Sequence, residues 1–70
     1  MENWVKVFKS TNAIEAEMVK DMLQENDIEA VVINKIDRSL NFGEASVWVF
    51  IDNEQVAKGF IQSNLINNYE

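Results

Sequence analysis

A chain of 70 residues that contains neither cysteine nor histidine must hold its fold by packing alone. A core this small supplies about 3–5 kcal/mol, so domains of this size are often reinforced by disulfides, a metal or association with another chain. Disulfides are excluded here, and the usual zinc sites need cysteine or histidine. We expect a single domain over residues 1–70, with a core over about 3–64 and a C-terminal tail over 65–70, reinforced by oligomerisation.

The charge balance narrows the choice of partner. Twelve acidic residues against six basic ones give a net charge of −6. Nucleic acids and anionic membrane surfaces are bound by clustered Lys and Arg, so we expect neither as a partner. The chain shows no signal-peptide pattern, and its apolar runs are far shorter than the ~20 residues of a membrane span. We therefore expect a cytoplasmic protein.

The residue types also argue against catalysis. Without Cys or His, the chain has no obvious nucleophile–base pair, and it has no Gly-rich loop for phosphates. We therefore expect no enzyme, no catalytic residue, no cofactor and no metal site.

The hydrophobic pattern predicts five elements in the order β-α-β-β-α. Strands are expected over 3–9, 28–33 and 44–51, where aromatic and β-branched residues dominate. The first helix is expected over 12–26, because Asn12 followed by Glu15 is a capping-box signature. Asp52 with Gln55 repeats that pattern and opens a second helix, which we expect to fray near Asn64.

The element order predicts the arrangement of the sheet. A right-handed β-α-β crossover makes the first two strands parallel, and the third strand then lies between them. The sheet order is thus 1-3-2, with both helices on one face. The predicted class is α+β, a ferredoxin-like fold without its last strand.

One face of this sheet is predicted to remain without helices. Side chains alternate across a strand, so each strand divides into two sets. The smaller, β-branched sets suit packing under helices and contain most of the Val and Ala. Four large aromatics fall on the other face, and each can bury about 150–250 Å², more than a monomer usually exposes. The residues predicted on the helix-free face are Trp4, Phe8, Val31, Ile33, Trp48 and Phe50.

Three kinds of cover suit such a face. A homodimer packed sheet against sheet is the first hypothesis. The tail, with Leu65, Ile66 and Tyr69, could instead fold over the face and make it part of the core. A different protein partner or a flat apolar ligand is the third. RNA stacking is not expected, because only Lys6 lies among the predicted aromatics.

The polar connection over 34–43 is a second candidate site, because it is longer than a hairpin needs. Its Lys35, Asp37, Arg38 and Ser39 suggest a small-molecule sensor for an anion or nucleotide, as an alternative function. The alternative structural interpretation is a solvated loop whose Ile36, Leu40 and Phe42 pack against the body.

Two helical features have a structural and a functional interpretation. Glu17, Asp21 and Glu25 are spaced four apart, so they could hold a divalent cation or form a solvated outer face. Gly59 lies inside the second predicted helix, where it costs about 1 kcal/mol against alanine. We expect it to allow a close approach of another element.

Several segments together resemble a known family. They are 4–7 (WVKV), 12–19 (NAIEAEMV), 26–32 (NDIEAVV) and Gly43-Glu44 leading into 47–49. Over about residues 3–62 the chain resembles the small bacterial domains of unknown function called putative prokaryotic signal-transducing proteins.

The resemblance implies a ferredoxin-like β-α-β-β-α fold, distantly similar to PII-type signalling proteins, and supplies no ligand or functional residues. PII-type proteins signal through the loop between their second and third strands, which corresponds to 34–43 here. The expected function is a small regulatory or binding module, with a role in signal transduction, that self-associates through the helix-free face.

Overall fold

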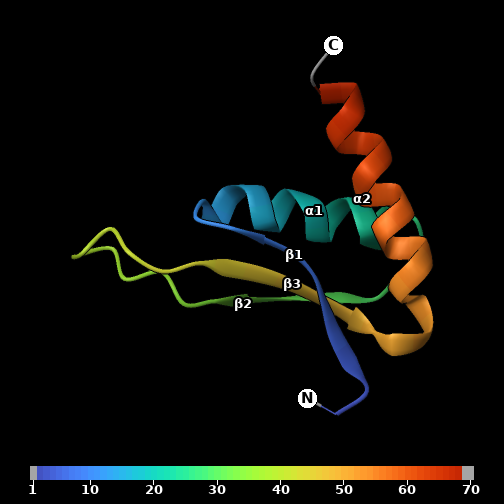
Figure 1. Cartoon of the computed structure of the whole chain (residues 1–70), viewed down its shortest axis with the longest axis horizontal. Coiled ribbons are helices and arrows are strands. Elements are labelled where there is room, and N and C mark those ends of the chain that lie inside the picture. Colours follow the sequence, from blue (N-terminus) through green and yellow to red (C-terminus); the bar gives the residue numbers. More distant parts are fainter. Residues whose placement is uncertain (1, 69–70) are drawn as a thin grey trace.

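The computed structural model describes the backbone of residues 2–68 and the side chains of residues 2–64. Figure 1 shows the elements in chain order. They are β1 (Trp4–Ser10), α1 (Ala13–Glu25), β2 (Ala30–Asn34), β3 (Ala45–Phe50), a 3-10 turn (Ile51–Asn53) and α2 (Glu54–Asn68). The predicted order β-α-β-β-α is confirmed.

The sheet has the order β1-β3-β2, with β3 antiparallel to both of its neighbours. β1 and β2 therefore run in the same direction, and α1 makes the crossover between them. The core lies between the sheet and the two helices, and its central members come from both. Those that are fully buried include Ala16, Leu23, Ala45, Val47, Val49 and Ala57. The predicted α+β ferredoxin-like class and the strand order 1-3-2 are confirmed.

Asn12 caps the start of α1, as the sequence predicts, but its backbone N–H has a different hydrogen-bond partner from the predicted one. The Asn12 side-chain oxygen accepts hydrogen bonds from the backbone N–H groups of Ile14 (2.9 Å) and Glu15 (3.4 Å). In a full capping box, the Glu15 side chain would bond the Asn12 N–H. Here that N–H donates to the Ser10 hydroxyl at 2.9 Å. Glu15 is thus left exposed beside the cap.

The end of α1 is a Schellman motif without glycine. The N–H of Ile28 donates to the Leu23 carbonyl at 2.9 Å, and the N–H of Asp27 donates to the Gln24 carbonyl at 3.1 Å. This pattern needs a left-handed residue between helix and strand, and Asp27 has φ 64°. Ile28 and Leu23 are both buried, so the motif also directs the chain from α1 into the core.

β1 contains a β-bulge that changes the predicted faces. Lys6 lies opposite Trp48, but Phe8 lies opposite Val47, so one extra residue is inserted at Val7. A bulge reverses the alternation of every residue that follows it. Phe8 therefore lies on the helix side, where it packs against the core. The prediction that Phe8 lies on the helix-free face is wrong, because strict alternation does not hold across the bulge.

α2 differs from its predicted bounds at both ends. Asp52 lies within the 3-10 turn, and α2 begins at Glu54. The helix continues to Asn68, past the point near Asn64 where fraying is expected. Within α2, Gly59 is exposed. A methyl group added at this position would meet nothing within 4 Å. The prediction that Gly59 allows a close approach is therefore wrong.

The hypothesis that Leu65, Ile66 and Tyr69 cover the sheet concerns side chains outside the described residues.

None of the helices described here combines the length and the apolarity needed to cross a membrane.

Candidate functional site: the helix-free sheet face

The strand register fixes which side chains share the helix-free face. Residues directly opposite each other in antiparallel strands point to the same side. Three cross-strand rows follow from this pairing. They are Trp4–Phe50, then Lys6–Trp48–Val31, then Lys9–Ser46–Ile33. We call these eight residues the helix-free face.

The first row forms an aromatic end. The rings of Trp4 and Phe50 meet edge to face, with centroids 6.2 Å apart and planes at 85°. This geometry suits the quadrupoles of two aromatic rings. Phe50 remains 36% exposed, and Val31 in the next row 37%. The outermost atoms of this end are therefore in water although the rings pack on each other.

The middle row holds Trp48 between polar partners. Its indole Nε1–H donates to the Ser46 hydroxyl at 2.9 Å, and that hydroxyl is 3.5 Å from the Ile33 carbonyl oxygen. The Lys6 ammonium lies 5.8 Å from the centroid of the Trp48 ring and 3.3 Å from the Glu44 carboxylate. These contacts satisfy the indole N–H and place a cation over the ring. Trp48 is thus held in one orientation on the sheet.

The structure brings together five of the six side chains predicted for this face: Trp4, Val31, Ile33, Trp48 and Phe50. It excludes Phe8 and puts Lys9 in its place, opposite Ser46. Sequence reasoning did not single out Lys9, Ser46 or Glu44. Ser46 could have been found, because it lies two residues before Trp48 on the same strand and therefore on the same face. Lys9 could not, since nothing in the alternation indicates a bulge.

The face is also more basic than the rest of the chain. Lys6 and Lys9 lie on it, and Lys35 lies opposite Glu44 at its far end, where the Lys35 N–H donates to the Glu44 carbonyl at 3.0 Å. Three of the six cations of an acidic chain therefore gather on one side of the sheet. Glu44 lies among them and pairs with Lys6, so charges of both signs occur on this side.

The connection between β2 and β3 is an ordered arm. Asp37 and Phe42 exchange backbone hydrogen bonds of 2.7 and 3.2 Å, which extends the hairpin beyond the strands. The Asp37 carboxylate accepts from the N–H groups of Ser39 and Leu40. Gly43, at φ 112°, lies where any side chain would collide with the Lys35 carbonyl. Asp37 thus has a structural role in the arm.

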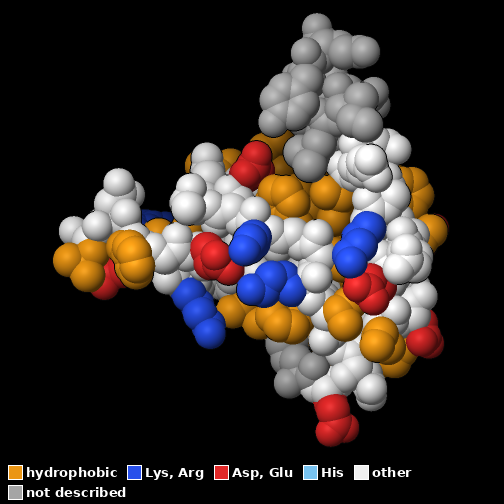
Figure 2. All heavy atoms as spheres, viewed as in Figure 1, with side chains coloured by type: hydrophobic (Ala, Val, Ile, Leu, Met, Phe, Trp, Pro, Cys, Tyr) orange, Lys and Arg blue, Asp and Glu red, His pale blue; other side chains and the backbone are white. Residues whose placement is uncertain are grey.

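The side chains of the arm do not all pack as predicted. Ile36 packs against the core, but Leu40 and Phe42 are 72% and 74% exposed. Figure 2 shows hydrophobic side chains at the tip of the arm, at the left of the view, and basic side chains over the middle of the molecule. The prediction that Leu40 and Phe42 pack against the body is wrong, because the hairpin carries them beyond it.

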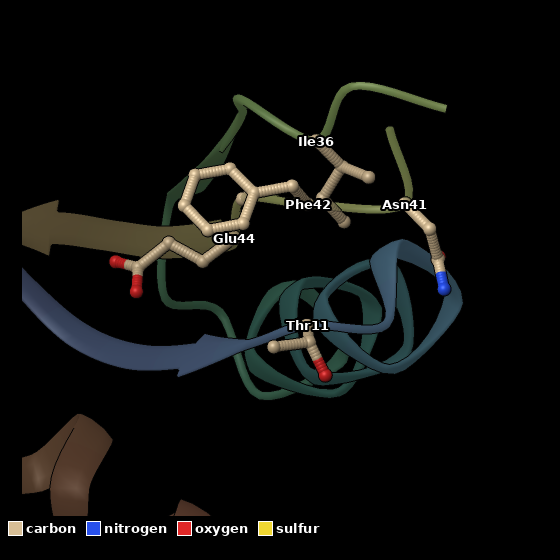
Figure 3. Close-up of a pocket in the computed structure, with 6 residues that line it drawn as sticks. Thr11, Ile36, Asn41, Phe42 and Glu44 are labelled. Atoms are coloured by element: carbon tan, nitrogen blue, oxygen red, sulfur yellow. The ribbon is translucent and has the colours of Figure 1, made fainter. Parts of the chain in front are cut away.

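An open hollow of about 500 Å³ lies beside the base of the arm. Figure 3 shows Thr11, at the turn before α1, across from Phe42 and Glu44. The hollow is lined by Thr11, Ile36, Asn41, Phe42, Gly43 and Glu44. It contains a carboxylate, and neither Lys35 nor Arg38 lines it. This lining does not suit an anion, so this hollow does not support the sensor hypothesis.

Lys20 lies among three acidic residues of α1, Glu17, Asp21 and Glu25. The Lys20 ammonium lies 3.1 Å from Glu17 and 3.4 Å from Asp21. The hydrogen bond and charge of Glu17, followed by those of Asp21, raise the pKa of Lys20. Over the part of the chain that the structure describes, no three acidic side chains cluster as metal ligands.

The outer side of α1 exposes two apolar residues. Ile14 and Met18, predicted on its apolar face, are 71% and 65% exposed. They line an open groove of about 400 Å³ with Met22 on α1 and Ile61 on α2. α2 crosses α1 at one end and rises beyond it (Figure 1), so its inner side reaches only part of α1. This explains why the apolar arc of α1 is broader than its buried part.

Comparison with known proteins adds one finding. No curated protein and no solved structure matches the chain. A family model described as putative prokaryotic signal transducing protein matches residues 4–62. The match begins at the first residue of β1 and ends within α2, so it includes every residue of the helix-free face. The chain therefore belongs to the family of putative prokaryotic signal transducing proteins.

Proposed function

We propose that the protein is a small non-catalytic module of signal transduction, acting in the cytoplasm, that docks a partner through the helix-free face. The observation that carries the proposal is the placement of Trp4, Trp48 and Phe50 on the sheet surface opposite the helices. Large aromatics are enriched in the cores of protein interfaces, where a few of them carry most of the binding energy. The family name supports a signalling role.

The chemistry of the face supports binding more than catalysis. Its side chains are aromatic, aliphatic, one hydroxyl and two lysines, and the Ser46 hydroxyl already accepts the Trp48 indole N–H. General base catalysis needs a proton acceptor within reach of the reacting group, and none of the eight residues of the face has a carboxylate or an imidazole. A preformed apolar surface with fixed aromatics needs little reorganisation to bind a partner.

The first partner in this proposal is a second copy of the chain, packed sheet against sheet. A two-fold interface brings the same patch together from both copies. Lys6 and Glu44 form an exposed ion pair of 3.3 Å within one copy. Across a two-fold axis the same two residues can exchange partners, so that each lysine bonds the carboxylate of the other copy. The aromatic ends then cover each other and lose their remaining contact with water.

Sedimentation equilibrium across micromolar concentrations tests this proposal. The wild type should show a dimer whose population rises with concentration. Trp48→Glu puts a carboxylate in the centre of the face and should lower the average mass at each concentration, because packing through the face is lost. The emission of Trp4 and Trp48 should move to shorter wavelength as the wild type associates, because the indoles leave water.

Val56→Glu is the matched control, since Val56 is a 53% exposed apolar residue on α2. It adds the same charge away from the face and should leave the mass unchanged. A wild type that stays monomeric, or a folded Trp48→Glu variant that keeps the wild-type mass, contradicts self-association through this face.

A further inference from the structure

β2 is an edge strand that lacks the usual protection. It pairs with β3 on one side only, and its residues Ala30–Asn34 (AVVIN) include no proline, glycine or charge. Natural proteins commonly protect such edges with bulges, charges or proline. The opposite edge, β1, has both a bulge and two lysines within the strand. The two edges of one sheet are therefore very different.

The register identifies which backbone groups of β2 face outward. Lys35 lies opposite Glu44 and donates its N–H to the Glu44 carbonyl. In an antiparallel ladder, bonded and non-bonded pairs alternate. Val31 and Ile33 therefore bond β3, while Ala30, Val32 and Asn34 point their N–H and C=O groups away from the sheet. The Gln24 side-chain amide donates to the Ala30 carbonyl at 3.3 Å, as expected for an outward group.

We propose that β2 is a pairing edge at which a second copy of the chain adds its own β2, antiparallel and centred on Val32. In this register Val32 lies opposite Val32 of the second copy, and Ala30 lies opposite Asn34. Each of these residues has outward backbone groups, so each such pair can exchange two hydrogen bonds. The bond from Gln24 to Ala30 is replaced by one from the other strand.

Charge complementarity selects this register and this partner. Glu29 and Lys35 are the residues that flank β2 on its two sides. Centred on Val32, the pairing puts Glu29 of each copy opposite Lys35 of the other. Centring on Ala30 would put Glu29 opposite Val31, and centring on Asn34 would put Lys35 opposite Ile33. Opposite charges facing each other across antiparallel strands stabilise the pair, and like charges destabilise it.

The same pairing joins the two helix-free faces. Val31 of one copy lies beside Ile33 of the other, on the side of the sheet that bears Trp48. The sheet then continues through both copies, and the helices of both lie on its other side. The inference uses a different surface from the proposed function, and it doubles the width of the docking face.

Charge-reversal variants of the flanking residues test the register. Glu29→Lys and Lys35→Glu each put like charges opposite each other at both ends of the paired strands. Each variant alone should therefore have a lower average mass than the wild type at the same concentration, because it no longer pairs through β2. Mixed in equal amounts, they should form a mixed dimer, because every flanking pair between the two variants is again of opposite charge.

Glu25→Lys is the matched control, because it makes the same charge change on the exposed side of α1. Circular dichroism establishes that each variant is folded. In the wild type, hydrogen exchange of the Val32 and Asn34 amides should slow as concentration rises, since both N–H groups become bonded. Single variants that keep the wild-type mass, a mixture that gains no mass over the single variants, or no concentration-dependent protection at Val32 overturns the proposal.

Trp48→Glu, measured beside these variants, separates the two surfaces. It lies on the face and leaves the outward groups of β2 intact, so it should not abolish amide protection at Val32. Loss of association in Trp48→Glu alone supports the face and overturns edge pairing. Loss in the flanking variants alone supports the edge and contradicts self-association through the face.

Discussion

The two faces of the sheet are stabilised in different ways. On the covered face, Ala45, Val47 and Val49 have no exposure at all, and their packing against α1 and α2 needs no polar contact. On the helix-free face, Trp48 is held by a hydrogen bond to Ser46 and by the ammonium of Lys6. The same central strand contributes to both.

The two faces therefore have different roles. The covered face forms the core, and the helix-free face holds aromatic side chains in fixed positions at the surface. Burial alone keeps the small residues in place, because every methyl group there has close neighbours. The aromatics of the other face are fixed by specific partners while part of their surface remains in water. A sheet side built in this way is ordered before any partner arrives. Substitutions on the two faces can test this contrast. Stability here means the free energy of unfolding, measured by urea denaturation.

Phe8→Ala gives the largest expected effect, because it tests which face Phe8 belongs to. Phe8 packs against the core on the covered side of the bulge, so its loss should cost about 3 kcal/mol. Phe50→Ala, on the helix-free face, should cost less than half as much. Equal costs for the two variants would mean that the bulge does not turn Phe8 inward.

Val47→Ala and Val31→Ala compare the same change on the two faces. Val47 is fully buried, so its variant should lose about 2 kcal/mol through lost burial and a residual cavity. Val31 is 37% exposed, and its variant should lose about 1 kcal/mol or less. At concentrations where the protein is monomeric, equal costs of Val31→Ala and Val47→Ala would show that another part of the chain already covers the helix-free face.

Trp48→Phe tests the hydrogen bond that orients the central indole. Phenylalanine keeps a ring on the face but cannot donate to Ser46, so stability should fall by about 1 kcal/mol. A double-mutant cycle with Ser46→Ala measures the coupling directly. Additive effects of the two changes would show that the bond contributes nothing. Trp4→Phe, at the aromatic end, is the control for the smaller ring.

Lys6→Met should have the smallest effect, about 0.5 kcal/mol, because the ion pair to Glu44 and the contact with Trp48 are exposed. Salt screens exposed charges. The difference in stability between the wild type and Lys6→Met should therefore shrink when salt is added. A salt response that is identical in both proteins would argue against any contribution from Lys6.

Much of the fold follows from local patterns in the sequence. The cap at Asn12, the order of the elements and the strand order 1-3-2 depend on short-range signals and on the handedness of one crossover. The covered face was predictable because Val47, Val49 and Ala45 alternate on an unbroken strand. On β2 and β3 the same rule also placed Val31, Ile33, Trp48 and Phe50 correctly.

The errors came where tertiary structure overrides local pattern. The bulge at Val7 inserts a single residue, so Phe8 and Lys9 each lie on the opposite face of the sheet from the one that strict alternation predicts. Nothing in the sequence of the strand indicates this insertion. Ile14 and Met18 extend the apolar arc of α1, but α2 crosses it too obliquely to bury them. Gly59 looks like a packing glycine, but it is exposed and an added methyl group would meet nothing within 4 Å. None of these follows from spacing alone.

The central position of β3 has a consequence for how the protein is made. β1 and β2 bond only to β3, which comes last of the three along the chain. During synthesis, neither early strand can begin to pair until β3, which starts at Ala45, leaves the ribosome. The emerging chain can form α1 before that point, but it cannot form any part of the sheet. Folding is therefore delayed until most of the protein has been translated, and the last strand completes all the pairings together.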